Sequence, residues 1–257
     1  MGYIPEGYFA CLTPTIYEKT GGTLPDELLV IGSAFIKNIK DACPSIDISV
    51  APALRFQNII NYNNSKKNKK IKRDLILLAM PMDLNQAQGI IKFVLNTDLD
   101  KRYKLVIKIH PKQSDISIYF DVFGTETYDI EWRFTNEHAF VLSSRSDFGI
   151  SLYSGVVVDF LFGNAVPSIE YSDMVGIPEC DNDLALRDKK GYPVFGYRYN
   201  EVVLGANNYD ELYNNVKLIM NEKEKVVNTL INNFNKVYQR VENPISTIVT
   251  DIINIVV

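Results

Sequence analysis

The residues with the clearest chemical potential lie at the end of an apolar run over residues 105–107. The run is followed by Lys108, His110, Pro111 and Lys112. A histidine here can donate to a phosphate oxygen or protonate a leaving group, and the lysines favour an anionic ligand. Pro111 restricts His110 to extended backbone. The alternative is a partly buried histidine that only ends a strand.

A second candidate site is a small-residue loop that opens an apolar helix. Ser151, Ser154 and Gly155 precede the apolar residues 156–162. A helix start offers free N–H groups and a positive dipole end to an anion, and serine hydroxyls add hydrogen bonds. The alternative is an ordinary helix cap by Ser154. If both loops follow strands of one parallel sheet, they face one crevice and predict a cradle for a nucleotide phosphate.

Two carboxylates could complete this chemistry. Glu6, in the sequence Pro5-Glu6-Gly7, is a candidate general base, with a plain surface turn as the alternative. Glu170 follows another apolar stretch and could accept a hydrogen bond from a ribose hydroxyl, as carboxylates do in dinucleotide sites. The second histidine, His138, is expected on a surface loop.

Alternating strand and helix patterns must position these residues. The alternation predicts an α/β fold with a Rossmann-like, doubly wound parallel sheet, preceded by a small N-terminal α/β fragment. We expect a partial N-terminal segment over residues 1–61, a basic linker over 62–73 and a Rossmann-like domain with C-terminal helices over 74–257. The expected strands cover residues 28–32, 46–50, 75–80, 103–109, 139–142, 149–154 and 166–171, and residues 116–123 could be strand or helix. The expected helices cover 34–40, 85–95, 156–162, 211–220 and 222–241, with a last helix from Pro244 to the C-terminus.

Composition excludes several classes of protein. The chain has 257 residues, 46% of them hydrophobic, and a net charge of −4, so no nucleic-acid partner is expected. Cys11, Cys43 and Cys180 have no metal-like spacing, which predicts free thiols in a reducing compartment and no metal site. No signal peptide and no apolar run of about 20 residues is present. We therefore expect a cytoplasmic protein without a cofactor.

A basic run over residues 66–73 begins at Lys66 and ends at Arg73. A solvated connection is the simpler interpretation. The alternative is a patch that binds anionic lipid, which would place the protein peripherally at the inner membrane face. The motifs G-x-G-x-x-G, G-x-x-x-x-G-K-[ST], H-E-x-x-H and G-x-S-x-G are all absent, which argues against classical dinucleotide oxidoreductases, P-loop NTPases, zincins and α/β-hydrolases.

Two segments together resemble the C-terminal domain of GT-B fold glycosyltransferases. They are KLVIKIHP, from Lys104 to Pro111, and YSGVVVDFLFGNAVPSIEY, from Tyr153 to Tyr171, in which Gly163 precedes the Pro167 strand. The resemblance is to the bacterial surface-polysaccharide group of sialyl-, Kdo- and glycerophosphotransferases, covers roughly residues 24–256, and implies an N-terminal domain upstream of this chain.

The resemblance implies a role for each candidate residue. His110 would bind the donor phosphate and help the nucleotide depart, and Ser154 would bind the same phosphate. Position 155 is glycine where the family usually has a second hydroxyl, for which the Ser143-Ser144 pair is a possible substitute. Glu6 matches part of the element that supplies the base.

The implied function is transfer of a sugar from a nucleotide-sugar, CMP- or UDP-linked, to a surface-polysaccharide or glycan acceptor. The alternatives are a non-catalytic nucleotide- or partner-binding domain of the same fold and a nucleotide-sugar epimerase.

Overall fold

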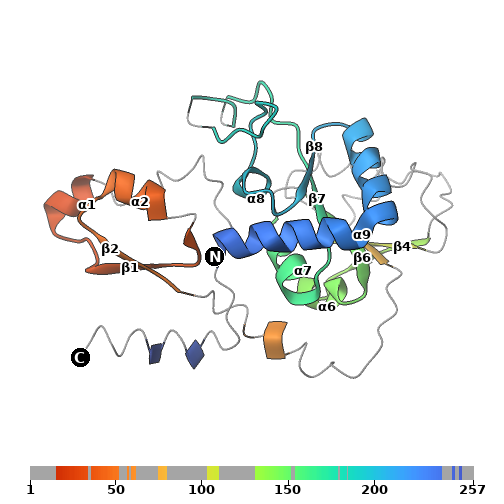
Figure 1. The fold of residues 1–257 in the computed structure, drawn as a ribbon, viewed down its shortest axis with the longest axis horizontal. Helices are drawn as coiled ribbons and strands as arrows, with labels where there is room; N and C mark the ends of the chain where they lie inside the picture. The colour runs from red at the N-terminus through yellow and green to blue at the C-terminus, as the bar shows by residue number, and fades with distance from the viewer. Residues whose placement is uncertain are drawn as a thin grey trace.

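A computed structural model gives the arrangement of the strands and helices (Figure 1). It describes residues 16–33, 36–51, 57, 59–61, 75–79, 103–109, 131–151, 154–178, 180–183, 185–238, 245–246 and 249–250. The expected helix over 85–95, the basic run over 66–73 and the candidates Glu6, His110 and Pro111 lie outside these residues.

Six parallel strands form the main sheet, in the order β5-β4-β3-β6-β7-β8. Of these six strands, β3 comes first in the sequence and lies in the middle of the sheet. The chain adds β4 and β5 on one side of it and then β6, β7 and β8 on the other. The predicted doubly wound, Rossmann-like sheet is therefore confirmed. The strands are β3 (Leu75–Ala79), β4 (Lys104–Lys108), β5 (Glu131–Thr135), β6 (Ser146–Ser151), β7 (Ser168–Tyr171) and β8 (Leu204–Ala206).

The central strands are buried on both faces. Leu105, Val106 and Ile107 of β4 are fully buried, as expected for a parallel sheet covered by helices on both sides. The described residues of this part of the chain include four helices: α6 (Ala139–Ser143), α7 (Val156–Asn164), α8 (Gly196–Tyr199) and α9 (Tyr209–Val237).

Helix α7 is buried along nearly its whole length because it lies between the sheet and α9. On the sheet side, a Cβ at Gly149 would lie 2.2 Å from the ring of Phe160, so the glycine lets that ring rest on β6. On the other side, the rings of Phe162 and Phe234 lie 6.1 Å apart. The helix ends at Ala165, whose φ of 51° is left-handed.

Helix α9 begins at a side-chain cap and bends in the middle. The Asn208 carboxamide accepts a hydrogen bond from the Glu211 N–H at 2.9 Å. Glu222 has non-helical φ and ψ of −130° and 34°, which agrees with the two separate helices expected from the sequence. The second part of α9 crosses α7 (Figure 1).

The N-terminal α/β unit is small. Its parallel strands enclose one helix over a cluster that contains Ile39 and Ile46. The unit contacts the end of α9, where the Ser33 hydroxyl donates to the Lys236 carbonyl at 3.0 Å. A Cβ at Gly32 would lie 1.9 Å from the Val237 carbonyl oxygen, so this approach requires glycine. The elements are α1 (Ile16–Gly21), β1 (Glu27–Val30), α2 (Ile36–Ala42) and β2 (Asp47–Val50).

Two expectations about the elements are corrected. Residues 139–142, predicted as a strand, form helix α6, and the strand follows it as β6. Burial of Ala139 and Leu142 follows a helical spacing, which a four-residue apolar run is too short to reveal. Strand β5 was not predicted. It is an edge strand, and its charged residues include Glu131, whose carboxylate pairs with Lys104 at 2.6 Å.

No helix in the described part of the chain combines the length and the apolar character that crossing a bilayer requires.

Candidate functional site

The candidate site lies where the strand order reverses, between β3 and β6. In open α/β sheets, ligands bind at the carboxyl ends of the strands that flank this reversal. Ala79 ends β3 and pairs in register with Lys108 on one side and with Ser151 on the other. Neighbouring strands are about 4.8 Å apart, so Lys108 and Ser151 lie about 10 Å apart, with the strand β3 between them.

The same row continues to both edges of the sheet. Lys108 pairs with Thr135, Ser151 with Glu170, and Glu170 with Gly205. Residues paired in register point to the same face of a sheet. One polar row thus crosses the carboxyl end of the sheet, on the face that α7 covers through Gly149 and Phe160.

Lys108 supplies positive charge at the end of β4. It is half-buried, and this burial lowers the pKa of its ammonium group. His110 and Pro111 follow two and three residues later in the sequence. Lys108, the first residue of the predicted Lys-x-His-Pro element, therefore lies at the same sheet edge as Ser151.

The start of α7 differs in part from the alternative interpretation, an ordinary helix cap by Ser154. Gly155, not Ser154, occupies the cap position, with φ and ψ of −60° and −6°. The Val156 N–H donates a hydrogen bond to the Ser154 hydroxyl oxygen at 3.4 Å. Within the described part of the chain, the Gly155 N–H donates no hydrogen bond. The helix start therefore has donors to offer to an anion.

Ser151 lies just before this helix start and is 2% exposed. Its hydroxyl oxygen is buried without a hydrogen-bond partner among the described residues. Such a buried, unsatisfied group costs about 1–3 kcal/mol in an empty site. A ligand oxygen or an ordered water at the start of α7 would remove that cost.

Ser143 and Ser144 do not substitute for the missing hydroxyl at position 155. They end α6 and precede β6, so they lie at the amino end of the strand, whereas the site lies at its carboxyl end. Their hydroxyls donate to the carbonyls of Phe140 and Val141 at 2.9 and 2.7 Å. This part of the prediction is wrong because sequence order did not reveal on which side of the strand the pair falls.

Glu170 is 1% exposed, and burial raises the pKa of its carboxyl to about 7, against an opposing effect of the Arg198 charge. Its Oε1 atom has no hydrogen-bond partner among the described residues. Ser168 and Ser172, two positions before and after it on the same face of the chain, also carry buried hydroxyls without partners. The carboxyl therefore lies in a buried, polar and unsatisfied environment beside Ser151.

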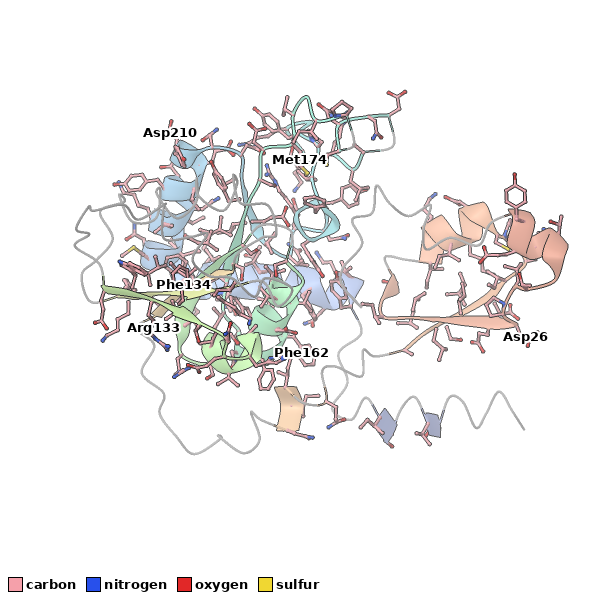
Figure 2. The ribbon with its side chains drawn as sticks, turned by 180° about the vertical axis from the view of Figure 1, so that it is seen from behind. Asp26, Arg133, Phe134, Phe162, Met174 and Asp210 are labelled. Atoms are coloured by element: carbon pink, nitrogen blue, oxygen red, sulfur yellow. The ribbon has the colours of Figure 1, made fainter. Side chains whose placement is uncertain are left out.

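Arg198 is a buried residue of the site that the sequence patterns missed. Its guanidinium donates to the Asp188 carboxylate at 2.6 Å and to the Asn207 carboxamide at 2.9 Å. The network continues at Lys190, whose ammonium group donates to the Glu211 carboxylate at 2.8 Å. These hydrogen bonds link the segment between β7 and β8 to the start of α9. Met174 and Asp210, which follow β7 and β8, lie at the same end of the domain (Figure 2).

The described residues contain no group of three or more histidine, cysteine, aspartate or glutamate side chains that could hold a metal ion. Cys43 is buried and Cys180 is half-buried, and neither forms a disulfide. His138 is exposed and directly precedes α6, in agreement with a surface position.

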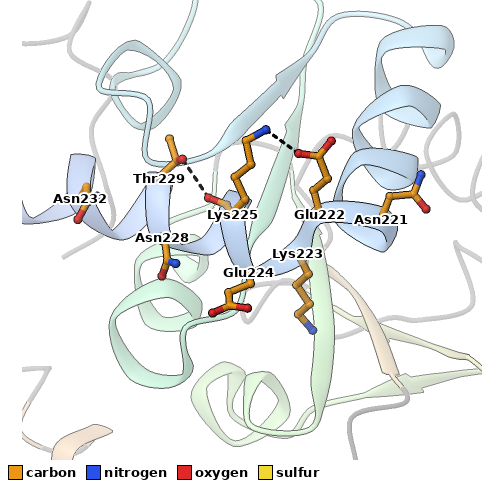
Figure 3. A pocket seen from close by; sticks show the side chains of 8 residues that line it. All are labelled: Asn221, Glu222, Lys223, Glu224, Lys225, Asn228, Thr229 and Asn232. Atoms are coloured by element: carbon orange, nitrogen blue, oxygen red, sulfur yellow. Dashed lines mark hydrogen bonds and ion pairs between the residues drawn. The ribbon is translucent and has the colours of Figure 1, made fainter.

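A surface depression also lies along the bend of α9 (Figure 3). Its lining comes from one helix, and all the side chains are polar. Lys225 pairs with Glu222 at 2.7 Å, and the Thr229 hydroxyl donates to the Lys225 carbonyl. It contains no buried polar group without a partner, so the sheet edge is the stronger candidate. The lining residues are Asn221, Glu222, Lys223, Glu224, Lys225, Asn228, Thr229 and Asn232.

Neither a protein-family model nor a curated protein sequence matches the chain. Solved structures do resemble it. A wall teichoic acid polymerase TagF variant soaked with CDPG matches with a TM-score of 0.53 and 13% identity, over 89% of this chain and 56% of the polymerase. The GtfA/B complex matches at 0.46 and 10%, over 92% and 47%. A UDP-N-acetylglucosamine 2-epimerase matches at 0.39 and 14%, over 84% and 69%.

The chain thus spans about half the length of the polymerase. At 13% identity the likeness bears on the fold alone. The chain has the Rossmann-like α/β fold of the GT-B glycosyltransferases.

Proposed function

We propose that the chain is the donor-binding part of a glycosyltransferase that moves a sugar from a nucleotide-sugar to a surface-polysaccharide or glycan acceptor. The observation that carries the proposal is the convergence of Lys108, Ser151 and the open start of α7 at the reversal of strand order. A cation, a hydroxyl without a partner and the Gly155 N–H at one edge suit a phosphate.

In this proposal each residue acts on a stated part of the donor. Lys108 and His110, with Pro111 fixing the backbone, meet the nucleotide phosphate from the β4 side. Ser151, Ser154 and Gly155 meet it from the α7 side. The hydrogen bonds gain strength as negative charge develops on the leaving phosphate, which is how such donors accelerate transfer.

The two carboxylates have separate proposed roles. Glu170 accepts a hydrogen bond from a ribose hydroxyl. Because its side chain is 1% exposed, this contact requires the covering groups to rearrange when the ligand enters. Glu6 is proposed as the base that takes the acceptor's proton. The proposed division remains residues 1–61, the linker 62–73 and the donor-binding domain 74–257.

Titration calorimetry with CMP-, CDP-, UDP- and GDP-linked sugars tests the proposal. Ser151→Ala and His110→Ala should each weaken binding of the preferred donor by about 2- to 10-fold or more, the loss of one or more hydrogen bonds. Lys217→Met, on the outer surface of α9, is the control and should bind normally. If none of these donors gives a measurable heat of binding, the result counts against the proposal.

The contact with Glu170 has its own ligand test. The diphosphate of the preferred nucleoside is compared with its 2′,3′-dideoxy form. Wild type should prefer the form with hydroxyls, and Glu170→Ala should lose most of that preference. Equal preference in the two proteins would remove Glu170 from the ribose contact.

The second candidate function is a non-catalytic nucleotide-binding domain of the same fold. Gly155 favours it, because glycine at the α7 cap supplies no side-chain hydroxyl. Turnover of the preferred donor by this chain joined to any upstream domain separates the two functions. The basic run from Lys66 to Arg73 is proposed as a contact for anionic lipid, which binding to phosphatidylserine vesicles with and without that run would test.

A further inference from the structure

Arg198 occupies a position that only a glycine in the neighbouring strand permits. A Cβ added at Gly205 would lie 2.1 Å from Nε of Arg198 and 2.6 Å from Cζ. The guanidinium therefore lies across β8 at Gly205. It is 7% exposed and is held there by the hydrogen bonds to Asp188 and Asn207.

The sheet register brings this guanidinium next to Glu170. Gly205 pairs directly with Glu170, and paired residues point to the same face. The positive charge acts on the Glu170 carboxyl, yet the guanidinium makes its hydrogen bonds to Asp188 and Asn207. The Asp188 carboxylate thus holds Arg198 in place. The Arg198 charge lowers the pKa of the Glu170 carboxyl, whose Oε1 atom has no hydrogen-bond partner among the described residues.

Three other charged groups lie on the neighbouring elements. Asp147 of β6 lies at the amino end of the strand and pairs with Lys223. Asp159 of α7 is buried. Glu211 of α9 pairs with Lys190. Among the described groups, Arg198 is the one whose charge is found to act on Glu170.

We propose that Arg198 is a positioning residue of the candidate site, whose charge favours the anionic form of the buried Glu170, the form that accepts a hydrogen bond from a hydroxyl beside the start of α7. Position 205 must be glycine for the same reason, because a side chain there would push the guanidinium away from Glu170. The use of that carboxylate by a ligand rests on the proposed function, whereas the effect of Arg198 on Glu170 does not.

The test measures the Glu170 pKa in the ligand-free chain by NMR of ¹³C-labelled glutamate carboxyls. Glu170→Gln assigns the signal by its disappearance. The wild-type pKa should be about 7. Arg198→Met should raise it by about one pH unit or more, the usual effect of removing a nearby opposite charge. Arg198→Lys, which keeps the charge, should restore most of the wild-type value.

Gly205→Ala tests the same idea without removing any charge, and it decides the matter if Arg198→Met does not fold. It should raise the Glu170 pKa in the same direction. Gly21→Ala is the matched control, because the nearest atom to its new Cβ is 3.9 Å away. Arg187→Met is the charge control, since Arg187 pairs with Asp181 in the same β7–β8 segment.

An unchanged Glu170 pKa in the folded Arg198 and Gly205 variants would overturn the inference. A raised pKa in both, with both controls at the wild-type value, supports it. Titration with the preferred nucleoside diphosphate is a separate arm. If the chain binds no nucleotide, the proposed function fails, while the pKa comparison still decides the role of Arg198.

Discussion

Replacing Glu170 by glutamine should change how stability depends on pH. Burial raises the pKa of this carboxyl from its usual 4.5 to about 7 in the folded chain. Between these values the folded state holds a proton that the unfolded state has released. Stability therefore falls as pH rises through this window, and it loses nothing more from this group above about pH 7.

The magnitude follows from the size of the window. One pH unit corresponds to about 1.4 kcal/mol, so the rise from 4.5 to about 7 corresponds to about 3 kcal/mol. Glutamine has nearly the shape of the protonated carboxyl and never ionises. Relative to wild type, Glu170→Gln should therefore gain about 3 kcal/mol of unfolding free energy between pH 4.5 and pH 8.

Urea unfolding at several pH values provides the assay. The difference between the two proteins matters, because all other titrating groups cancel in it. Glu224→Gln, on the exposed surface of α9, is the control and should show a constant difference. If the Glu170→Gln difference also stays constant from pH 4.5 to pH 8, the carboxyl is not desolvated as described and the reasoning about this buried row is refuted.

Three further substitutions test the packing and the helix starts. Gly149→Ala should cost about 1–3 kcal/mol in urea unfolding, because its Cβ would meet the Phe160 ring at 2.2 Å, whereas Gly21→Ala should be near neutral. Asn208→Ala should cost about 0.5–2 kcal/mol by the same measurement through loss of the α9 cap, and no change would show that the cap contributes nothing. Gly155→Ser should tighten nucleotide binding in calorimetry by about 2- to 10-fold, since the backbone there suits any residue and a hydroxyl is added at the phosphate position; weaker binding would contradict this placement.

The sheet could be predicted because its signals are local. Continuous apolar runs such as residues 105–107 indicate a strand buried on both faces, and alternation with helical patterns indicates a parallel sheet. The bend near Glu222 was also visible, as a break between two helical patterns. Residues 139–142 were misassigned because four apolar residues carry no period that separates helix from strand.

The candidate site was predicted only where chemistry coincided with a strand end. Lys108, Ser151 and Glu170 each follow or end an apolar stretch, which is why the sequence places them at one sheet edge. Arg198 gives no such signal, because its importance depends on burial and on the absence of a side chain at Gly205. The strand register, which the sequence does not encode in any local pattern, then pairs Gly205 with Glu170.

The central claim is that a nucleotide phosphate binds at the start of α7. The most direct measurement is the change in backbone amide chemical shifts when the ¹⁵N-labelled chain is titrated with CDP. The account predicts the largest changes at Gly155 and Val156, and with Ser151→Ala it predicts that the same changes require about 2- to 10-fold more CDP. Largest changes along the α9 depression near Asn228, or none at the start of α7, would contradict it.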